Sequence, residues 1–423
     1  MKAAAPPHTD LGTIGTDREQ TARGPWGSLR YRSRPVARTP RTGRRTDIRR
    51  ILALILLFLA ALSAAPPVLV AASETDALIQ LLVDKGLITV EEAAALRSEP
   101  AVQKQEEKDL RPKEFQLTAG KALKLSGYTQ ARYRQADTIK DTFDVRRARL
   151  SLRGDLGSGF DYRLQADFAG SSAKLLDAAL GWRYSEGLKV TAGQFKIPFS
   201  QENLQSSNKM ELINRSLVVG ALVARGLDVI GEQNGRDVGI MAGGTWSPGS
   251  RPSLVEYAAG VFNGSGINRT DPNDQKDLVG RLVVKPRSGL SVGLSCYEGR
   301  YILASAPDKR DIRRRLGAEF AYQAGPFLAR GEYIKGQDAE IRKDGWYLLG
   351  GWMAVPGKFQ LLYRYDAYDP DRDLDGNGSR LDTIGFAWYI NKWVFLQVNY
   401  DRAGGRLEKT SSDAYIGQLT LQF

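Results

Sequence analysis

The sequence predicts an all-β fold, an antiparallel transmembrane β-barrel of about 16 strands with a short helical N-terminal segment on the periplasmic side. Three observations favour this class. Polar and apolar residues alternate from Lys121 onward, the polar positions are rich in arginine, and aromatic residues gather at the ends of the alternating segments. Beyond residue 72 no apolar run is long enough for a membrane-spanning helix, so strands are the expected spanning elements.

The alternation is clear in individual segments, among them KLSGYTQARYR, FDYRLQADF, RLGAEFAY, KFQLLYRYDAY and WVFLQVNYD. Each spans about ten residues and is bounded by turn sequences such as GDLGSG or DGNG. At roughly 19 residues per strand and connection, residues 121–423 provide about 16 strands. A soluble β-sandwich would alternate in the same way, with its apolar face turned inward.

Two further features favour the barrel, whose apolar face is turned outward. Tryptophans lie at the ends of predicted strands, where a membrane-interface girdle would place them: Trp182, Trp352, Trp388 and Trp393. The chain also ends on an alternating strand, YIGQLTLQF, with Phe423 in phase with its apolar residues. This ending resembles the recognition signal of the outer-membrane barrel assembly machinery, which is therefore an expected partner.

Residues 1–72 are expected to be a leader containing a signal peptide, with Arg49 and Arg50 before an apolar h-region at 51–65. The alternative is a true anchor helix. Residues 73–97 show helical spacing of leucines and predict a short helical segment. Residues 98–120 are charged and read as a linker, and 121–423 form the barrel.

Charge and composition exclude several classes of function. Of the net charge of +12, residues 1–50 carry +8, so the mature chain gives little support for nucleic-acid binding. His8 is the only histidine and Cys296 the only cysteine, which excludes an intrachain disulfide and catalysis through a Ser-His or Cys-His pair. We therefore expect neither an enzyme nor a cofactor.

One long interruption breaks the alternation between residues 196 and 236. Pro198 cannot donate to a strand ladder, so the preceding strand is expected to end there. A connection of this length is usually functional, either as an external lid or as a constriction folded into the lumen. Its composition favours folding inward, because small donors and cations follow one another there: Lys196, Ser206, Ser207, Lys209 and Arg215.

The polar phase of the strands predicts a ladder of basic residues in the lumen. A guanidinium presents a fork of donors that matches the oxygens of phosphate, so such a ladder would favour anions. Alternatively, many of these arginines would only neutralise carboxylates that are also expected to point into the lumen: Asp161, Asp167, Asp177, Glu319, Glu332, Asp366 and Asp382. The predicted ladder consists of Arg132, Arg134, Arg147, Arg149, Arg163, Arg183, Arg281, Arg313, Arg315, Arg330 and Arg364.

The segment DPDRDLDGNGSRLD has the aspartate spacing of a calcium-binding loop. Its candidate ligands are Asp371, Asp373, Asp375 and Asp382. No helices flank it, so the alternative is an acidic external hairpin, where divalent ions would bridge lipopolysaccharide.

The segments FDVRRARLSLRGDL, DAALGW and GQFKIPFSQENLQSSNKMELINRS resemble the phosphate-selective porin O/P family, and the resemblance extends over most of residues 75–423. It implies a trimeric, 16-stranded porin of a Gram-negative outer membrane with its third loop in the lumen. Ser206, Ser207 and Arg215 match loop residues that contact the anion, and Asp177 matches a single lumen carboxylate nearby. The family's phosphate-selective members are expected to carry a lysine at or near Asn203, which this chain lacks.

The expected function is therefore an anion-preferring outer-membrane channel for phosphate, polyphosphate or similar anions. The expected partners are inorganic anions, outer-membrane lipid and lipopolysaccharide, and further copies of the chain in a homotrimer. The alternative is a structural or adhesive barrel whose lumen is plugged by the long loop and whose N-terminal helical segment binds a partner.

Overall fold

The computed structural model describes residue 85 and residues 115–116, 122–136, 139–247, 254–303, 306–405 and 413–423. The chain divides into two units, Met1–Arg97 and Ser98–Phe423, and the barrel lies in the second. The predicted leader, almost all of the predicted helical segment and most of the predicted linker lie outside the described residues.

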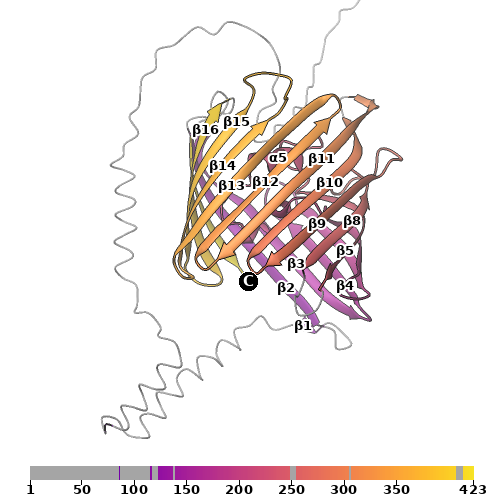
Figure 1. The fold of residues 1–423 in the computed structure, drawn as a ribbon. Helices are drawn as coiled ribbons and strands as arrows, with labels where there is room; N and C mark the ends of the chain where they lie inside the picture. Colours follow the sequence, from indigo (N-terminus) through magenta and orange to yellow (C-terminus); the bar gives the residue numbers. More distant parts are fainter. Residues whose placement is uncertain are drawn as a thin grey trace, which may run out of the picture. The chain divides into compact units, whose positions relative to one another are not determined.

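The second unit is a closed antiparallel barrel of 16 strands, β2 to β17, as predicted (Figure 1). Each strand pairs with its neighbour in sequence, and β17 closes the ring by pairing with β2. The strands are β2 Ala122–Ala136, β3 Ile139–Gly157, β4 Phe160–Asp167, β5 Lys174–Arg183, β6 Lys189–Lys196, β7 Arg236–Trp246, β8 Val255–Phe262, β9 Asp277–Arg287, β10 Leu290–Leu303, β11 Ala306–Ala324, β12 Phe327–Asp338, β13 Ile341–Val355, β14 Phe359–Asp369, β15 Ser379–Tyr389, β16 Val394–Gly405 and β17 Ala414–Gln422. A two-residue strand, β1 Phe115–Gln116, pairs with the start of β2.

The two ends of the barrel differ in their connections. Short turns such as Ser158–Gly159 between β3 and β4 lie at the end that also carries the C-terminus (Figure 1). The longer connections, 197–235, 263–276 and 370–378, lie at the opposite end. We call this opposite end the loop end. Phe423 pairs with Gly127 through two backbone hydrogen bonds of 3.0 Å, which fixes the C-terminus to the first barrel strand.

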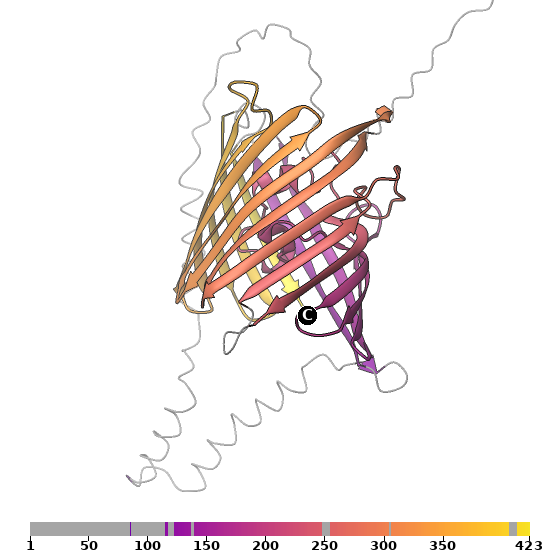
Figure 2. The ribbon, with the colours of Figure 1, turned by 45° about the vertical axis from the view of Figure 1, so that its right-hand side comes forward.

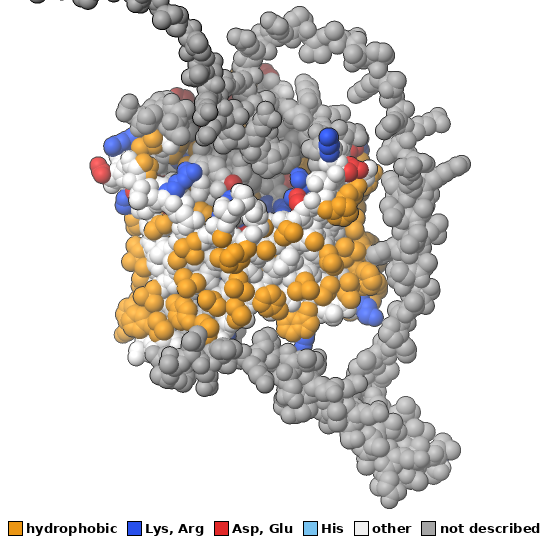
Figure 3. Space-filling model, turned by 180° about the vertical axis from the view of Figure 1, so that it is seen from behind, with side chains coloured by type: hydrophobic (Ala, Val, Ile, Leu, Met, Phe, Trp, Pro, Cys, Tyr) orange, Lys and Arg blue, Asp and Glu red, His pale blue; other side chains and the backbone are white. Residues whose placement is uncertain are grey.

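The outward face of the wall is apolar and the inward face is polar. Leu294, Leu316 and Ile384 are 60%, 57% and 58% exposed. Their sequence neighbours Ser295, Arg315 and Thr383 point inward and are at most 4% exposed. This arrangement is the reverse of a soluble sandwich and is the pattern that lipid requires. Figure 3 shows apolar side chains in a broad band around the wall.

Aromatic pairs border this apolar band. At the short-turn end they include Phe160–Trp182 and Phe359–Trp388, with ring centroids 6.3 and 6.1 Å apart. At the loop end they include Tyr133–Phe143, Trp346–Tyr365 and Tyr400–Tyr415. The predicted girdle is thus present at both edges, where amphipathic rings meet the lipid headgroups. None of the helices in the described ranges has the length and hydropathy that crossing a bilayer requires.

A β-bulge lies in β3 within the sequence FDVRRARL. Gln130 pairs with Arg147 and Ala131 pairs with Val145, so Arg146 is the extra residue. Arg146 donates to the Asn214 side chain in the long loop, at 2.7 Å. Arg147 donates to the Gln130 side chain at 2.8 Å. The bulge therefore directs two successive arginines into the lumen.

The connection from β6 to β7, residues 197–235, folds back inside the barrel, and we call it the third loop. It contains three short helices, α4 Gln201–Leu204, η1 Ser207–Lys209 and α5 Leu217–Leu222. Ser200 caps α4 and Ser216 caps α5, each accepting a hydrogen bond from a backbone N–H three residues later. Helix α5 lies within the outline of the barrel in both ribbon views (Figures 1 and 2).

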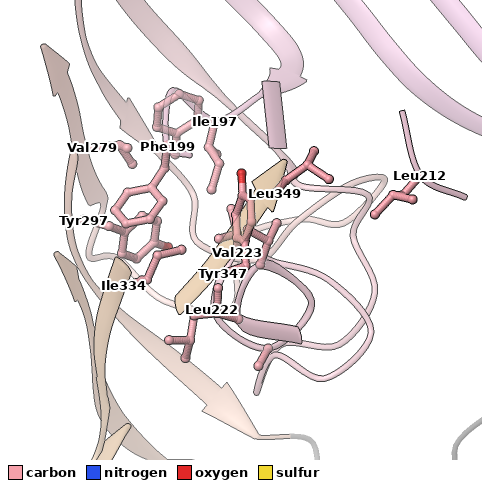
Figure 4. Close-up of a cluster of buried hydrophobic side chains, with 14 of the residues drawn as sticks. Ile197, Phe199, Leu212, Leu222, Val223, Val279, Tyr297, Ile334, Tyr347 and Leu349 are labelled. Carbon is pink, nitrogen blue, oxygen red and sulfur yellow. The ribbon is translucent and has the colours of Figure 1, made fainter. Parts of the chain in front are cut away.

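Apolar side chains fasten the third loop to one side of the wall (Figure 4). Phe199 and Leu222 of the loop are each 1% exposed, and they belong to one cluster with Ile334 of β12 and Tyr347 of β13. The lumen therefore contains a hydrophobic core of its own, between the loop and the strands β6, β8 to β10 and β12 to β14. On its other side the loop contacts β2 and β3, because Ser207 accepts hydrogen bonds from Gln130 and Arg149.

Candidate functional site

Buried ion pairs reinforce the attachment of the third loop. Asp228 of the loop accepts from Arg313 at 2.8 and 3.1 Å, and Arg315 lies 3.7 Å from the same carboxylate. All three side chains are at most 2% exposed. Burial would raise the pKa of Asp228, but the two guanidinium groups hold it below its ordinary value. Asp228 is therefore ionised in place and ties the loop to β11.

Three more arginines of the predicted ladder are paired in the same region. Arg364 bonds Asp366 at 2.7 Å and also donates to the backbone oxygen of Asn214, at 2.8 Å. Arg330 bonds Glu211 of the loop at 2.6 Å, and Arg281 bonds Glu319. Arg315 additionally pairs with Asp338 at 2.7 Å. Five predicted ladder residues, Arg281, Arg313, Arg315, Arg330 and Arg364, thus neutralise carboxylates on the side that holds the loop.

The opposite side of the loop carries cations whose partners are neutral. Lys196 donates to the backbone oxygens of Leu204 and Gln205, at 3.0 and 2.8 Å. Arg215 donates to the backbone oxygens of Glu202 and Gln205, and its Nε is buried without a partner. Carbonyl oxygens satisfy these donors but do not cancel their charge. The carboxylates whose charge reaches these cations are Glu202 and Glu232 for Arg215, and Asp177 for Lys196.

Three further arginines extend this group. Arg147 donates to the Gln130 side chain, and Arg146 to that of Asn214. Arg225 donates to Oδ1 of Asn203, at 2.7 and 3.1 Å, and to the backbone oxygen of Asn234. Burial lowers the pKa of the Arg225 guanidinium, and the nearby Arg215 lowers it further, because like charges lie within electrostatic reach. We call the set Arg146, Arg147, Lys196, Arg215 and Arg225 the cationic cluster.

The two predicted serines lie beside this cluster. Ser207 is buried, and its hydroxyl accepts from Arg149 at 3.5 Å while its backbone oxygen accepts from Gln130 at 3.3 Å. Ser206 donates to the Asn208 side chain at 2.5 Å. Lys209 is exposed at the end of η1. The predicted loop residues are therefore gathered on the side of the loop that faces β2 and β3.

Asp177 is buried between two arginines and is 1% exposed. It accepts from Arg236 at 2.6 and 3.1 Å, and Arg163 lies 2.9 Å away. Its negative charge is therefore compensated within the wall. Arg163 remains 37% exposed despite this pair.

The other predicted ladder residues differ in their pairing. Arg132 and Arg134 share Asp144, at 2.6 and 3.2 Å. Arg149 pairs with Asp167 at 2.7 Å, and Arg183 is exposed at the end of β5. Two arginines on one carboxylate leave an excess of positive charge near β2.

Asn203, where the resemblance leads us to expect a lysine, is fully buried. Its side-chain amide donates to the backbone oxygens of Ile197 and Gly235, at 3.4 and 3.1 Å, and its oxygen accepts from Arg225. Gly235 has a φ of +66°, and a Cβ there would lie 1.7 Å from Oδ1 of Asn203. Asn203 thus joins the two ends of the loop, and Arg225 places a cation next to it.

Among the described residues, the four aspartates of the predicted calcium loop do not form a group of three or more that could hold a metal ion. Asp373 forms an ion pair with Arg342, and Oδ1 of Asp371 accepts from the backbone N–H of Asp373. Asp382 lies on β15, where it accepts from the hydroxyl of the outward-facing Tyr363. Across the described ranges, no three metal-ligating side chains of the acidic, histidine or cysteine type come together. The expected inward orientation of Asp382 is wrong, because it shares the phase of the exposed Ile384.

Comparison with known proteins agrees with this geometry. The sequence matches the model of the family described as phosphate-selective porin O and P, over residues 115–310 and 301–423. An uncharacterised protein of Aquifex aeolicus is 22% identical over 323 residues, which cover 65% of this chain and 74% of its own length.

Solved porin structures share the fold. The anion-selective porin of Comamonas acidovorans aligns with a TM-score of 0.54 at 17% identity, covering 72% of this chain and all of its own. The outer-membrane channel DcaP of Acinetobacter baumannii aligns with a TM-score of 0.54 at 14% identity, covering 73% of this chain and 99% of its own.

The closed 16-strand barrel, its apolar outer band and its polar lumen define an outer-membrane porin of Gram-negative type. More specifically, the chain belongs to the phosphate-selective porin O and P family.

Arg146, Arg225 and Arg236 were missed by the sequence analysis. Arg146 was hidden by the bulge, since strict alternation allows only one of two adjacent arginines to face inward. Arg225 lies in a loop, where no alternation exists. Arg236 is the first residue of β7 and directly follows Gly235. At the first residue of a strand no preceding alternation indicates whether the side chain faces the lumen or the lipid.

Proposed function

We propose that this porin is an anion-preferring channel whose constriction lies between the third loop and the strands β2 and β3. The observation that carries the proposal is the unequal pairing of the lumen cations. On the side that holds the loop, Arg313, Arg315 and Arg364 are neutralised by carboxylates. The donors of the cationic cluster instead bond backbone carbonyl oxygens and the side-chain amide oxygens of Gln130, Asn203 and Asn214.

An anion entering the constriction would exchange part of its hydration for these donors. Guanidinium groups bind oxyanions through paired N–H donors, and the exposed Lys209 adds a mobile ammonium. Because each of these cations already donates to a protein oxygen, binding is weakened enough to allow release. Conduction requires such a balance between attraction and escape. Phosphate, polyphosphate and similar oxyanions fit this donor set.

The same proposal includes a homotrimer, export by a signal peptide and recognition of the last strand by the barrel assembly machinery. The OmpT porin of Vibrio cholerae, a structural neighbour with a TM-score of 0.51, has been solved in a trimer form. Phe423 is 46% exposed on the outer face, where an assembly factor could reach it. The porin family and the barrel fold favour a channel over an enzyme.

The proposed function is tested by competition in planar bilayers. Phosphate, pyrophosphate and sulfate added to one side are expected to block the chloride current of the pure folded protein. Pyrophosphate should block most strongly, because it can engage two members of the cationic cluster. Equal currents with and without these oxyanions would contradict an oxyanion site at the constriction.

A second candidate function is a structural or adhesive barrel whose lumen is closed. It is favoured by the size of the hydrophobic core between loop and wall, which fills one side of the lumen. Its partner-binding segment would be residues 73–97, which are outside the described residues apart from Lys85. Absence of single-channel steps from the pure folded protein in the same bilayers would favour this candidate.

A further inference from the structure

The outer wall carries a groove that the channel function does not use. A row of small outward-facing residues crosses four adjacent strands, because Ala242, Ala259, Gly280 and Cys296 are direct cross-strand partners. The row above it contains Ile240, Val261 and Leu278, which are 52%, 39% and 58% exposed. The row below contains Tyr257, Leu282 and Leu294, which are also exposed. We call the small row the floor of a groove of about 1110 Å³, which the row above it also lines.

The groove runs toward a group of charged side chains on the outer face of β10 to β13. Its floor continues through Leu316 of β11 to Lys335 of β12, each the direct partner of the residue before it. Lys335 is exposed, and in the part of the chain that the structure describes it has no carboxylate partner. It lies three residues before the end of β12 at the loop end.

Three arginines line the groove near Lys335. Arg314 pairs with Glu298 at 2.7 Å, Arg342 pairs with Asp373, and Arg372 lies 3.4 Å from Asp344. The arginines are 46% to 64% exposed, so these ion pairs are weak and a stronger anion can displace the carboxylates. The groove is therefore apolar along its floor and cationic at its loop end.

We propose that this groove binds a phosphorylated acyl lipid of the outer leaflet. An acyl chain would lie along Ala242, Ala259, Gly280 and Cys296, and a headgroup phosphate would reach Lys335 and the neighbouring arginines. The charge complementarity selects this occupant, because a lipid is apolar along its chain and anionic only at its outer end. The proposal rests on the outer-membrane setting and is independent of the anion selectivity of the lumen.

The headgroup is tested by native mass spectrometry of the full folded chain in detergent, titrated with lipid A. Lys335→Gln is expected to weaken lipid A binding roughly fivefold, since one basic residue near a phosphorylated surface contributes about that factor. The matched control is Arg380→Gln, which removes an outward-facing cation at the loop end of β15. Equal weakening by both changes, or equal binding of dephosphorylated lipid A, would overturn the headgroup assignment.

The floor of the groove is tested through Cys296, the only cysteine of the chain. Lipid A is expected to slow alkylation of Cys296 by N-ethylmaleimide severalfold, because the acyl chain would cover the thiol. Ala259→Leu should abolish this protection by filling the groove. Ala131→Leu adds the same atoms to the exposed face of β2 and should leave the protection intact.

Two further experiments distinguish a bound lipid from other possible occupants of the groove. Inorganic phosphate alone should neither protect Cys296 nor compete with lipid A, and protection by phosphate alone would overturn the lipid proposal. If Ala259→Leu dissociates an oligomer while lipid A binding stays unchanged, the groove is an interface between copies of this chain and the proposal fails. Bilayer currents are not read in these experiments, so their outcome is separate from that of the channel proposal.

Discussion

Replacing Asp228 with asparagine is expected to detach the third loop from the barrel wall. Arg313 and Arg315 are each at most 2% exposed; Arg313 pairs with this carboxylate at 2.8 Å, and Arg315 lies 3.7 Å from it while pairing with Asp338 at 2.7 Å. Removing one partner of a buried ion pair costs about 3–5 kcal/mol, because the remaining charge stays buried without compensation. The hydrophobic cluster around Phe199 and Leu222 opposes release but covers only one side of the loop. We therefore expect Asp228→Asn to populate an undocked loop.

The measurement combines single-channel recording with limited trypsin digestion. The unmodified chain should show steady currents and resist cleavage after Arg225, which is buried. Asp228→Asn should show noisy currents of larger amplitude and rapid cleavage there. Asp375→Asn, a change at an exposed loop aspartate, is the matched control and should behave like the unmodified chain. Quiet currents and full protease resistance in Asp228→Asn would show that the ion pair does not hold the loop.

The same pair predicts how docking depends on pH. The folded-state pKa of Asp228 lies below its ordinary value, so its stabilising effect is fully present at neutral pH. It is lost only as the pH falls below about 4, through the lowered pKa. Current noise should accordingly rise in strongly acidic buffer and not between pH 6 and 8.

The second large effect is expected from neutralising two members of the cationic cluster together, Arg147→Gln with Lys196→Gln. Neither residue has a carboxylate partner among the described side chains, so the double change removes two uncompensated charges from the passage. A unit charge about 4 Å from an ion contributes on the order of 4 kcal/mol at intermediate dielectric, before desolvation is subtracted. We expect the block by phosphate to weaken at least roughly tenfold, which corresponds to about 1.4 kcal/mol.

The matched control variant neutralises both members of an ion pair, instead of two cations that have no carboxylate partner among the described side chains. Arg281→Gln with Glu319→Gln removes one cation and one anion, and the glutamine oxygen can still accept from the backbone N–H of Gln201. Phosphate block should be unchanged in this variant. Equal loss of block in both double variants would mean that general disturbance of the lumen, and not the charge of the cationic cluster, sets the affinity.

The architecture could be predicted because alternation is a local property of the chain. Each strand shows its own phase, and the apolar phase must face lipid in a barrel. The break before Pro198 could be recognised for the same reason, since alternation stops there and returns only at β7. The aromatic girdle and the C-terminal strand could be predicted as well, because each is recognisable in a short segment of the sequence.

The partners of the lumen charges could not be predicted from local patterns. Arg313 meets Asp228, which is 85 residues away, and only the three-dimensional path of the loop brings them together. The sequence showed eleven ladder arginines as equivalent, whereas the structure divides them by their partners. Asp382 is a different case, because the apolar Ile384 and Phe386 share its phase and already indicated the outward side. The inward orientation was predicted from the polarity of Asp382 itself and not from the apolar residues that share its phase.

The central claim is that uncompensated cations beside the third loop make the lumen prefer anions. The most direct measurement is the reversal potential of the pure folded chain in a planar bilayer with a potassium chloride gradient. We expect a reversal potential of the sign that chloride sets, and a shift toward zero in Arg147→Gln with Lys196→Gln. A reversal potential of the sign that potassium sets would show that the lumen prefers cations.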